Sequence, residues 1–198
     1  MKTLALFDFD GTITTKDSLA EFIKYAVGGW GYYSGLLRLS PMLTAYTLKL
    51  IPNHIAKERM LSYFFKGYNE DAFKKMADTY SLNEISKILR EEAMEKIRWH
   101  QMQGHTVVIV SASMESWLKA WCDMHKIDLI STCLEIKDEK ITGKFLTKNC
   151  YGPEKANRVR AQYDLDEYEY IYAYGDSSGD TELLALADES FYKPFRED

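Results

Sequence analysis

The sequence has 198 residues, of which 46% are hydrophobic and 28% are charged, and it carries a formal net charge of −5. This length and composition fit one sizeable core, with or without a smaller insert, and exclude an intrinsically disordered chain. The negative charge excludes a surface that attracts nucleic acid or anionic lipid as a whole, so small-molecule partners are expected and nucleic acid is not.

The cysteines and the first residues indicate a cytoplasmic protein. Cys122, Cys133 and Cys150 are odd in number and lack CxxC spacing, which favours neither a disulfide framework nor a structural zinc site. Met1 and Lys2 lead directly into an apolar run, without the charged leader, apolar stretch and small-residue cleavage site of a secretory signal. We therefore expect a location in the reducing cytoplasm.

Four short apolar segments are predicted to be buried strands. They are rich in β-branched or aromatic residues and are closed by Gly, Ser or Asp. The segments are Thr3–Phe7, Thr106–Val110, Leu129–Cys133 and Glu169–Tyr174.

Helical patterns separate these strands. A helix is predicted over Glu84–Gln103, ending at Gly104, and another over Met114–His125 with Ser113 as its N-cap. Pro153 suits the first turn of a helix that continues to Arg160. Strands that alternate with helices predict an α/β fold with a doubly wound parallel sheet. Residues 134–145 alternate in hydrophobicity and predict a small structural hairpin beside that sheet.

The first crossover is far longer than a βαβ connection needs. We therefore expect residues 16–89 to form a helical cap inserted after the first strand, and residues 1–15 and 90–198 to form the core.

Part of this cap is unusually apolar. Between Ala26 and Leu50 the only charged residues are Arg38 and Lys49, and Arg38 and Pro41 interrupt a run too short to span a membrane. Cap helices that pack on each other and on the core would explain this composition. A lid that touches a membrane interface or receives an apolar leaving group would explain it too, and would favour a lipid-like substrate.

The first predicted strand ends in an unusual pair of carboxylates, Asp8 and Asp10. Ligands of parallel α/β sheets bind beyond the carboxyl ends of the strands, where this pair lies. Two carboxylates this close repel each other unless a cation joins them or one is protonated, so the pair favours a reaction site. The alternative is that Asp10 and the glycine after it simply form a turn.

Other strand ends add matching groups. The second strand ends near Ser111, Lys155 lies at the start of a later helix, and the last strand leads into Asp176 and Asp180. Carboxylates that hold Mg²⁺, facing a hydroxyl and an ammonium that hold phosphate oxygens, would account for this set. Each residue alone also has an ordinary explanation, such as a helix cap or a solvated lysine. The four histidines share no metal-ligand spacing, and surface or structural roles are expected for them.

Four motifs in this order resemble the haloacid dehalogenase superfamily of phosphohydrolases. They are DFDGT at 8–12, the serine at the end of VVIVS at 107–111, the lysine of GPEKANR at 152–158, and GDSSGD at 175–180. The resemblance spans nearly the whole chain and is nearest to the phosphoserine phosphatase-like branch, subfamily IB. It implies a Rossmann-like core with a helical cap and a phosphatase activity.

The resemblance also implies catalytic and metal-binding roles. Asp8 would be the nucleophile that becomes an aspartyl phosphate, and Asp10 the general acid and base, with crowding by Asp8 favouring its protonated state. Magnesium would be held by the carboxylate of Asp8, the backbone carbonyl of Asp10 and Asp176, with Asp180 close by.

The phosphate would be held by a second group of residues. Ser111, the neighbouring Ala112 and Lys155 would position the phosphoryl oxygens, and Thr12 would support the loop. The predicted activity is therefore a Mg-dependent phosphomonoesterase, with a phosphotransferase or mutase of the same fold as one alternative. A binding module without turnover is the other.

Two positions bear on the substrate. Phosphoserine phosphatases usually have Asn where this chain has Gly179, which argues against phosphoserine. Asp17 lies where those enzymes often hold the substrate ammonium, but it would equally well start a helix.

Overall fold

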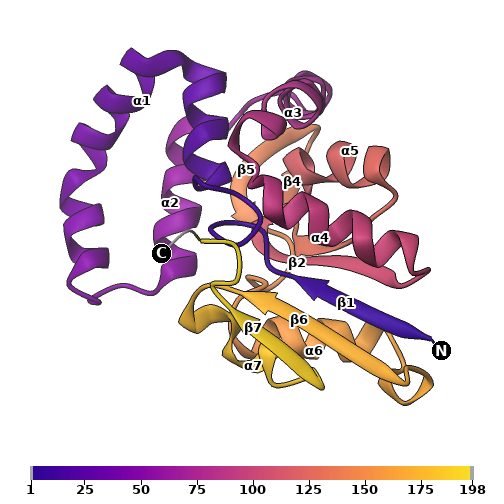
Figure 1. Ribbon diagram of the computed structural model, residues 1–198. Helices are drawn as coiled ribbons and strands as arrows, with labels where there is room; N and C mark the ends of the chain where they lie inside the picture. Colours follow the sequence, from indigo (N-terminus) through magenta and orange to yellow (C-terminus); the bar gives the residue numbers. More distant parts are fainter. Residues whose placement is uncertain (1, 197–198) are drawn as a thin grey trace.

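A parallel sheet of five strands lies at the centre of the computed structural model, which describes residues 2–196 (Figure 1). The strand order is β3-β2-β1-β6-β7, so the first strand of the chain occupies the middle of the sheet. All four pairings are parallel. The strands are β1 (Thr3–Phe7), β2 (Thr106–Met114), β3 (Asp128–Thr132), β6 (Tyr170–Gly175) and β7 (Glu189–Tyr192).

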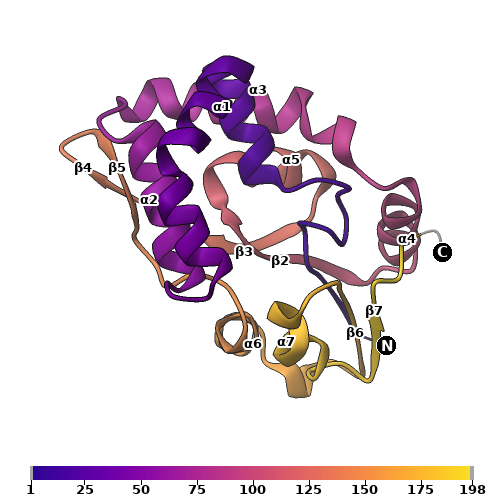
Figure 2. The same cartoon turned by 90° about the vertical axis from the view of Figure 1, so that its left-hand side faces the viewer.

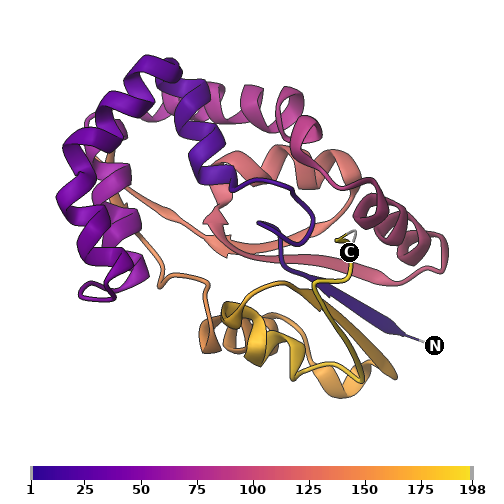
Figure 3. The same ribbon diagram turned by 60° about the vertical axis from the view of Figure 1, so that its left-hand side comes forward.

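Side chains of β1 alternate between two apolar layers. Leu4 and Leu6 pack in one cluster with Val159 of helix α6, whereas Ala5 and Phe7 pack in another with Trp117 of helix α5. Figures 2 and 3 show α6 and α7 on one side of the sheet and α4 and α5 on the other. The predicted doubly wound α/β fold is therefore confirmed. These helices are α4 (Glu91–Met102), α5 (Glu115–His125), α6 (Pro153–Gln162) and α7 (Thr181–Leu184).

Three helices connect β1 to α4 in the part of the chain predicted to be a cap. They are α1 (Ser18–Thr47), α2 (Asn53–Phe65) and α3 (Glu70–Asn83), followed by the 3₁₀ turn η1 (Ile85–Ile88). Helix α1 continues through Pro41 and is instead kinked at Gly28, whose φ of 72° lies outside the helical region. The division into cap and core domains remains a prediction.

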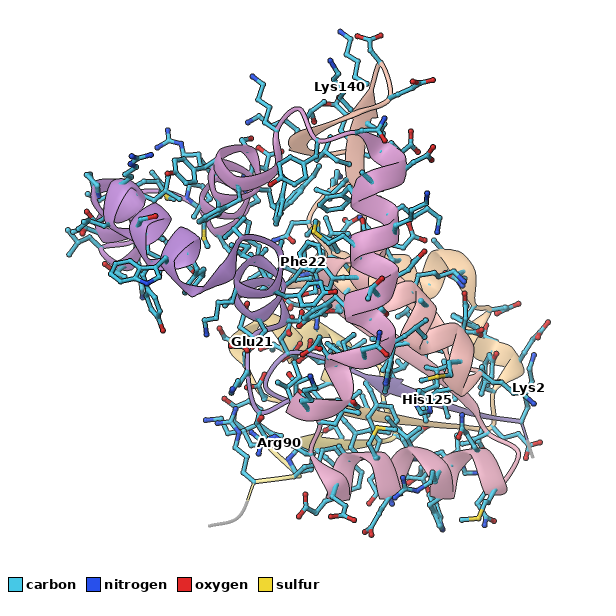
Figure 4. All side chains as sticks on the ribbon, turned by 90° about the horizontal axis from the view of Figure 1, so that it is seen from above. Lys2, Glu21, Phe22, Arg90, His125 and Lys140 are labelled. Atoms are coloured by element: carbon cyan, nitrogen blue, oxygen red, sulfur yellow. The ribbon has the colours of Figure 1, made fainter. Side chains whose placement is uncertain are left out.

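Helices α1, α2 and α3 pack on one another, on α5 and on the predicted hairpin. Helix α3 lies along α5, and α2 lies between α1 and strand β5 (Figure 1). The hairpin itself is present, as an antiparallel pair of β4 (Leu134–Lys137) and β5 (Lys140–Phe145). Phe22 points into the interior beside α3 (Figure 4), and its ring stacks on Trp117 of the core with centroids 4.7 Å apart. The start of α1 is thus fixed to the core by aromatic packing.

The single helix predicted over residues 84–103 is wrong. The chain forms η1 there, becomes extended at Leu89 and Arg90, and only then enters α4. The backbone N–H of Arg90 donates to the carbonyl oxygen of Ile13 over 2.8 Å, in the loop after β1. This tertiary hydrogen bond replaces a helical one, which local propensity alone does not indicate.

Other boundaries also differ from the predictions. Strand β2 does not stop at Val110 but continues to Met114, so Ser113 lies in the strand and does not cap α5. Strand β7 was not predicted, because residues 189–192 are largely exposed at the edge of the sheet and form only a weak apolar pattern. Of the described residues, none forms a helix long and apolar enough to cross a membrane.

Candidate active site

A buried lysine joins two aspartates at the carboxyl end of the sheet. The ammonium of Lys155, in the first turn of α6, lies 2.5 Å from Oδ1 of Asp8 and 2.6 Å from Oδ1 of Asp180. All three side chains are buried, with Lys155 2% and Asp180 1% exposed. Strand β1, helix α6 and the loop after β6 each supply one of these charges, as the sequence predicted.

Burial and pairing act in opposite directions on these groups. Burial opposes the charge of Lys155, but Asp8 and Asp180 outweigh it and raise the lysine pKa. Burial also raises the pKa of Asp8, to about 7, against the lowering effect of Lys155. For Asp180 the lysine outweighs burial and lowers the pKa. Lys155 therefore favours the ionised form of Asp180, whereas burial is the main cause of the raised pKa of Asp8.

The position of Asp180 is set by the loop after β6. Its Oδ2 accepts hydrogen bonds from the backbone N–H of Asp176 at 3.1 Å, the backbone N–H of Ser177 at 3.0 Å and the hydroxyl of Ser177 at 2.9 Å. A carboxylate held by three donors is oriented as well as charged. Its other oxygen is thereby aimed at Lys155.

Asp8, Asp176 and Asp180 form a carboxylate cluster in which one oxygen of each lies within 4.8 Å of the others. Burial and Asp180 raise the pKa of Asp176, which also forms an ion pair with Arg196. Carboxylate oxygens gathered in this way are hard donors of the kind that Mg²⁺ binds. The donor set therefore fits the ion that the motifs imply.

Asp10 is not part of this cluster and is held by two serines. Its Oδ1 accepts the backbone N–H of Ser18 at 2.7 Å, and its Oδ2 accepts the hydroxyl of Ser113. Burial raises the pKa of Asp10, and the charge of Asp17 adds to the effect. The expected direction is thus present, but burial rather than crowding by Asp8 is its main cause.

Ser113, which the sequence pattern predicted to be the N-cap of α5, instead lies at the site. Its hydroxyl contacts that of Ser18 at 2.8 Å, and the indole N–H of Trp117 donates to Ser18 at 3.2 Å. Its backbone N–H donates to the hydroxyl of Ser111 at 3.0 Å. The pairing of β2 with β3 shifts register between Ser111 and Met114, so strand alternation alone does not place Ser113.

The remaining predicted residues line the same edge. The hydroxyl of Thr12 donates to Oδ2 of Asp8 at 2.9 Å, which agrees with a supporting role. The carbonyl oxygen of Ala112 accepts from Lys57 at 3.3 Å. Lys57 lies on α2, and its approach to the site depends on tertiary packing that no local sequence pattern indicates. The phosphate-binding roles of Thr12, Ser111 and Ala112 remain predictions.

Two positions considered for substrate selection have structural explanations. Asp17 is the N-cap of α1, and its side chain accepts the backbone N–H of Ala20 at 2.9 Å. Gly179 lies against Tyr151, so that a Cβ at this position would be 2.3 Å from the tyrosine ring. The aromatic ring occupies the space into which an asparagine side chain would extend.

Known proteins resemble this chain over nearly its whole length. Protein CicA of Caulobacter vibrioides is 36% identical over 98% of this chain and 86% of that protein. A probable phosphatase of Mycobacterium tuberculosis is 28% identical over 98% of this chain and 70% of that protein.

Solved structures share the fold. A Bordetella pertussis protein of unknown function has a TM-score of 0.83 at 22% identity, covering 96% of this chain and 89% of that one. A phospho-aspartyl intermediate analogue of phosphoserine phosphatase has a TM-score of 0.68 at 18% identity, covering 96% and 85%. A model of the haloacid dehalogenase-like hydrolase family matches residues 5–185. The chain therefore belongs to the haloacid dehalogenase-like hydrolases.

Proposed function

We propose that this protein is a Mg-dependent phosphomonoester hydrolase that forms an aspartyl phosphate on Asp8. The observation that carries the proposal is the separation of two neighbouring carboxylates into different surroundings. The buried Asp8 pairs with Lys155 within the carboxylate cluster, whereas the partly buried Asp10 accepts the backbone N–H of Ser18 and the hydroxyl of Ser113. Two carboxyl groups in such contrasting surroundings suit a nucleophile and an acid.

The first step would transfer the phosphoryl group to Asp8. A carboxylate oxygen of Asp8 forms a bond to phosphorus as the ester oxygen leaves, and the protonated Asp10 gives its proton to that oxygen. The ammonium of Lys155 offsets the charge of the phosphoryl oxygens. Magnesium held by Asp8, Asp176 and Asp180 would supply further positive charge for the phosphoryl group and keep Asp8 ionised.

The second step would release phosphate. Asp10, now ionised, takes a proton from a water molecule whose oxygen attacks phosphorus, and the bond from phosphorus to Asp8 breaks. Inorganic phosphate leaves, and both carboxyl groups return to their starting states. Support comes from membership of the family and from the relative described as a probable phosphatase.

The proposed substrate is a small or lipid-like phosphate monoester, and the proposed location is the cytoplasm. Tyr151 beside Gly179 argues against phosphoserine, because the ring fills space near the end of the last motif. Lys57 adds a cation at the rim of the site. The three cysteines are free thiols, as a reducing compartment would keep them.

A panel of soluble and lipid phosphate monoesters, assayed for released phosphate with Mg²⁺, tests the proposal. Chelation should abolish release and Mg²⁺ should restore it. Asp8→Asn and Asp10→Asn should abolish release while the protein still folds, and Asp166→Asn, at an exposed position, serves as a matched control. Transfer to an added alcohol in place of water would indicate a phosphotransferase, and turnover by Asp8→Asn would refute the aspartyl phosphate.

A further inference from the structure

Helix α1 carries an apolar stripe on its outer side. Trp30 is 92% exposed, Tyr33 64%, Leu37 76% and Leu48 64%. Trp30, Tyr33 and Leu37 are three and four residues apart, which keeps them on one side of a helix with 3.6 residues per turn, and Leu48 is the C-cap that directly follows α1. We call these four residues the outer stripe. Large apolar groups gathered on one exposed surface are unusual for a protein that works alone in water.

The fold does not use the outer stripe. The opposite side of α1 makes the contacts with the rest of the protein, through the buried Tyr32, Gly35 and Met42. Figures 1 and 3 show α1 at the edge of the molecule, with α2 between it and the hairpin. The expectation that packing explains the apolar cap is therefore met on one side of α1 only.

Charge indicates what the outer stripe contacts. No Asp or Glu lies between Glu21 and Glu58, although the whole chain has a net charge of −5. Arg38 and Lys49 lie within and just after α1, and within residues 2–196 neither forms an ion pair. Arg38, which donates a hydrogen bond to the hydroxyl of Tyr63 on α2 at 3.3 Å, and Lys49 are thus cations beside the outer stripe that have no ion-pair partner among the described residues.

We propose that the outer stripe docks this protein on the surface of an anionic membrane. Trp and Tyr favour the boundary between lipid headgroups and acyl chains, Leu37 and Leu48 would bury their side chains below it, and Arg38 and Lys49 would meet anionic headgroups. A second copy of this chain fits less well, because two such surfaces would bring their unpaired cations together.

The helix that carries most of the outer stripe also contributes to the site. Helix α1 begins at Ser18, whose backbone N–H binds Asp10, and α2 sends Lys57 to the rim of the site. A groove of about 670 Å³ lies where α2 begins, between Pro52 and Tyr151. The docking proposal concerns binding alone and stands whether or not the proposed hydrolysis occurs.

Vesicle sedimentation tests the proposal, with phosphatidylcholine vesicles compared with an equal mixture of phosphatidylcholine and phosphatidylglycerol. The protein should be retained by the mixed vesicles, and added salt should weaken retention. Retention should fall about tenfold or more in Trp30→Ser/Leu37→Ser and in Arg38→Glu/Lys49→Glu. The control Met102→Ser/Leu146→Ser removes side chains that are 76% and 69% exposed elsewhere, and should leave retention unchanged.

A second measurement separates docking from damage to the fold. Tryptophan emission should shift to the blue on mixed vesicles, and the shift should be lost in Trp30→Phe although that variant still binds. Absence of retention on mixed vesicles, or an equal loss in the control, would overturn the proposal. So would sedimentation of a dimer that the outer-stripe substitutions convert to a monomer, because a second copy would then cover the stripe.

Discussion

Acid should destabilise this protein through His100, a histidine buried far from water. The ring is 0% exposed, with Nε2 2.9 Å from the hydroxyl of Tyr174 and Nδ1 2.8 Å from Nδ1 of His105. A neutral imidazole satisfies both contacts with one donor and one acceptor. Burial, with the nearby His105 and Lys96, lowers the pKa of His100 to about 3. The structural role expected for this histidine is confirmed.

The direction in which stability changes with pH depends on the pKa of His100 in the folded and unfolded states. Unfolded His100 has a pKa of about 6.5, so between about pH 6.5 and pH 3 the unfolded chain binds a proton that the folded protein does not. Stability from this group is complete above pH 6.5 and is lost as the pH falls toward 3. Linkage with these two pKa values gives a loss of about 2 kcal/mol between about pH 7.5 and pH 5.

Urea unfolding across this pH range measures the effect. His100→Gln keeps a polar group near Tyr174 but cannot titrate, so its stability deficit relative to the natural protein should shrink by about 2 kcal/mol between about pH 7.5 and pH 5. The exposed His54→Gln should follow the natural protein at every pH. A deficit for His100→Gln that stays constant with pH would show that His100 binds protons equally in the folded and unfolded states, and would refute this reasoning.

Two further predictions concern the site. Ser113→Ala should lower kcat about tenfold or more at unchanged KM, because the Ser113 hydroxyl holds Asp10 rather than the substrate. Ser113→Thr, which keeps the hydroxyl, should restore most of the lost kcat. An unchanged kcat in Ser113→Ala would exclude this positioning role. Gly179→Ala should lower the free energy of unfolding by about 1–3 kcal/mol, measured by urea unfolding, because its Cβ would lie 2.3 Å from the Tyr151 ring. Adding Tyr151→Ala should recover part of that loss. No loss in Gly179→Ala would mean that the ring moves freely.

Most of the fold and the centre of the site were predictable, because parallel topology converts distant positions in the sequence into neighbours in space. Apolar runs that end in Asp8 and before Asp176, together with Lys155 at a helix start, already imply one shared edge. In the structure, the buried Lys155 contacts both Asp8 and Asp180 at that edge. Charged residues that follow strands therefore predict a shared site, because a parallel sheet places the carboxyl ends of its strands at one edge.

What escaped prediction depends on tertiary contacts. Arg90 leaves the helical pattern because its backbone binds Ile13, and Ser113 serves Asp10 because β2 continues past its apolar run. Lys57 reaches the site from the cap through helix packing alone. In each case the contacting residue is distant in sequence, so local propensity and periodicity do not indicate the contact.

The central claim is that Asp8 accepts the phosphoryl group, and acid quenching during turnover tests it most directly. The protein is mixed with Mg²⁺ and a phosphate monoester that it hydrolyses, and is then quenched with acid. Mass spectrometry should find one added phosphoryl group on the peptide that contains Asp8, and none in Asp8→Asn. Asp10→Asn should retain the adduct longer if the leaving group is good, because water then lacks its base. Turnover with phosphate release but no adduct at any time, or an adduct on another residue, would contradict the account.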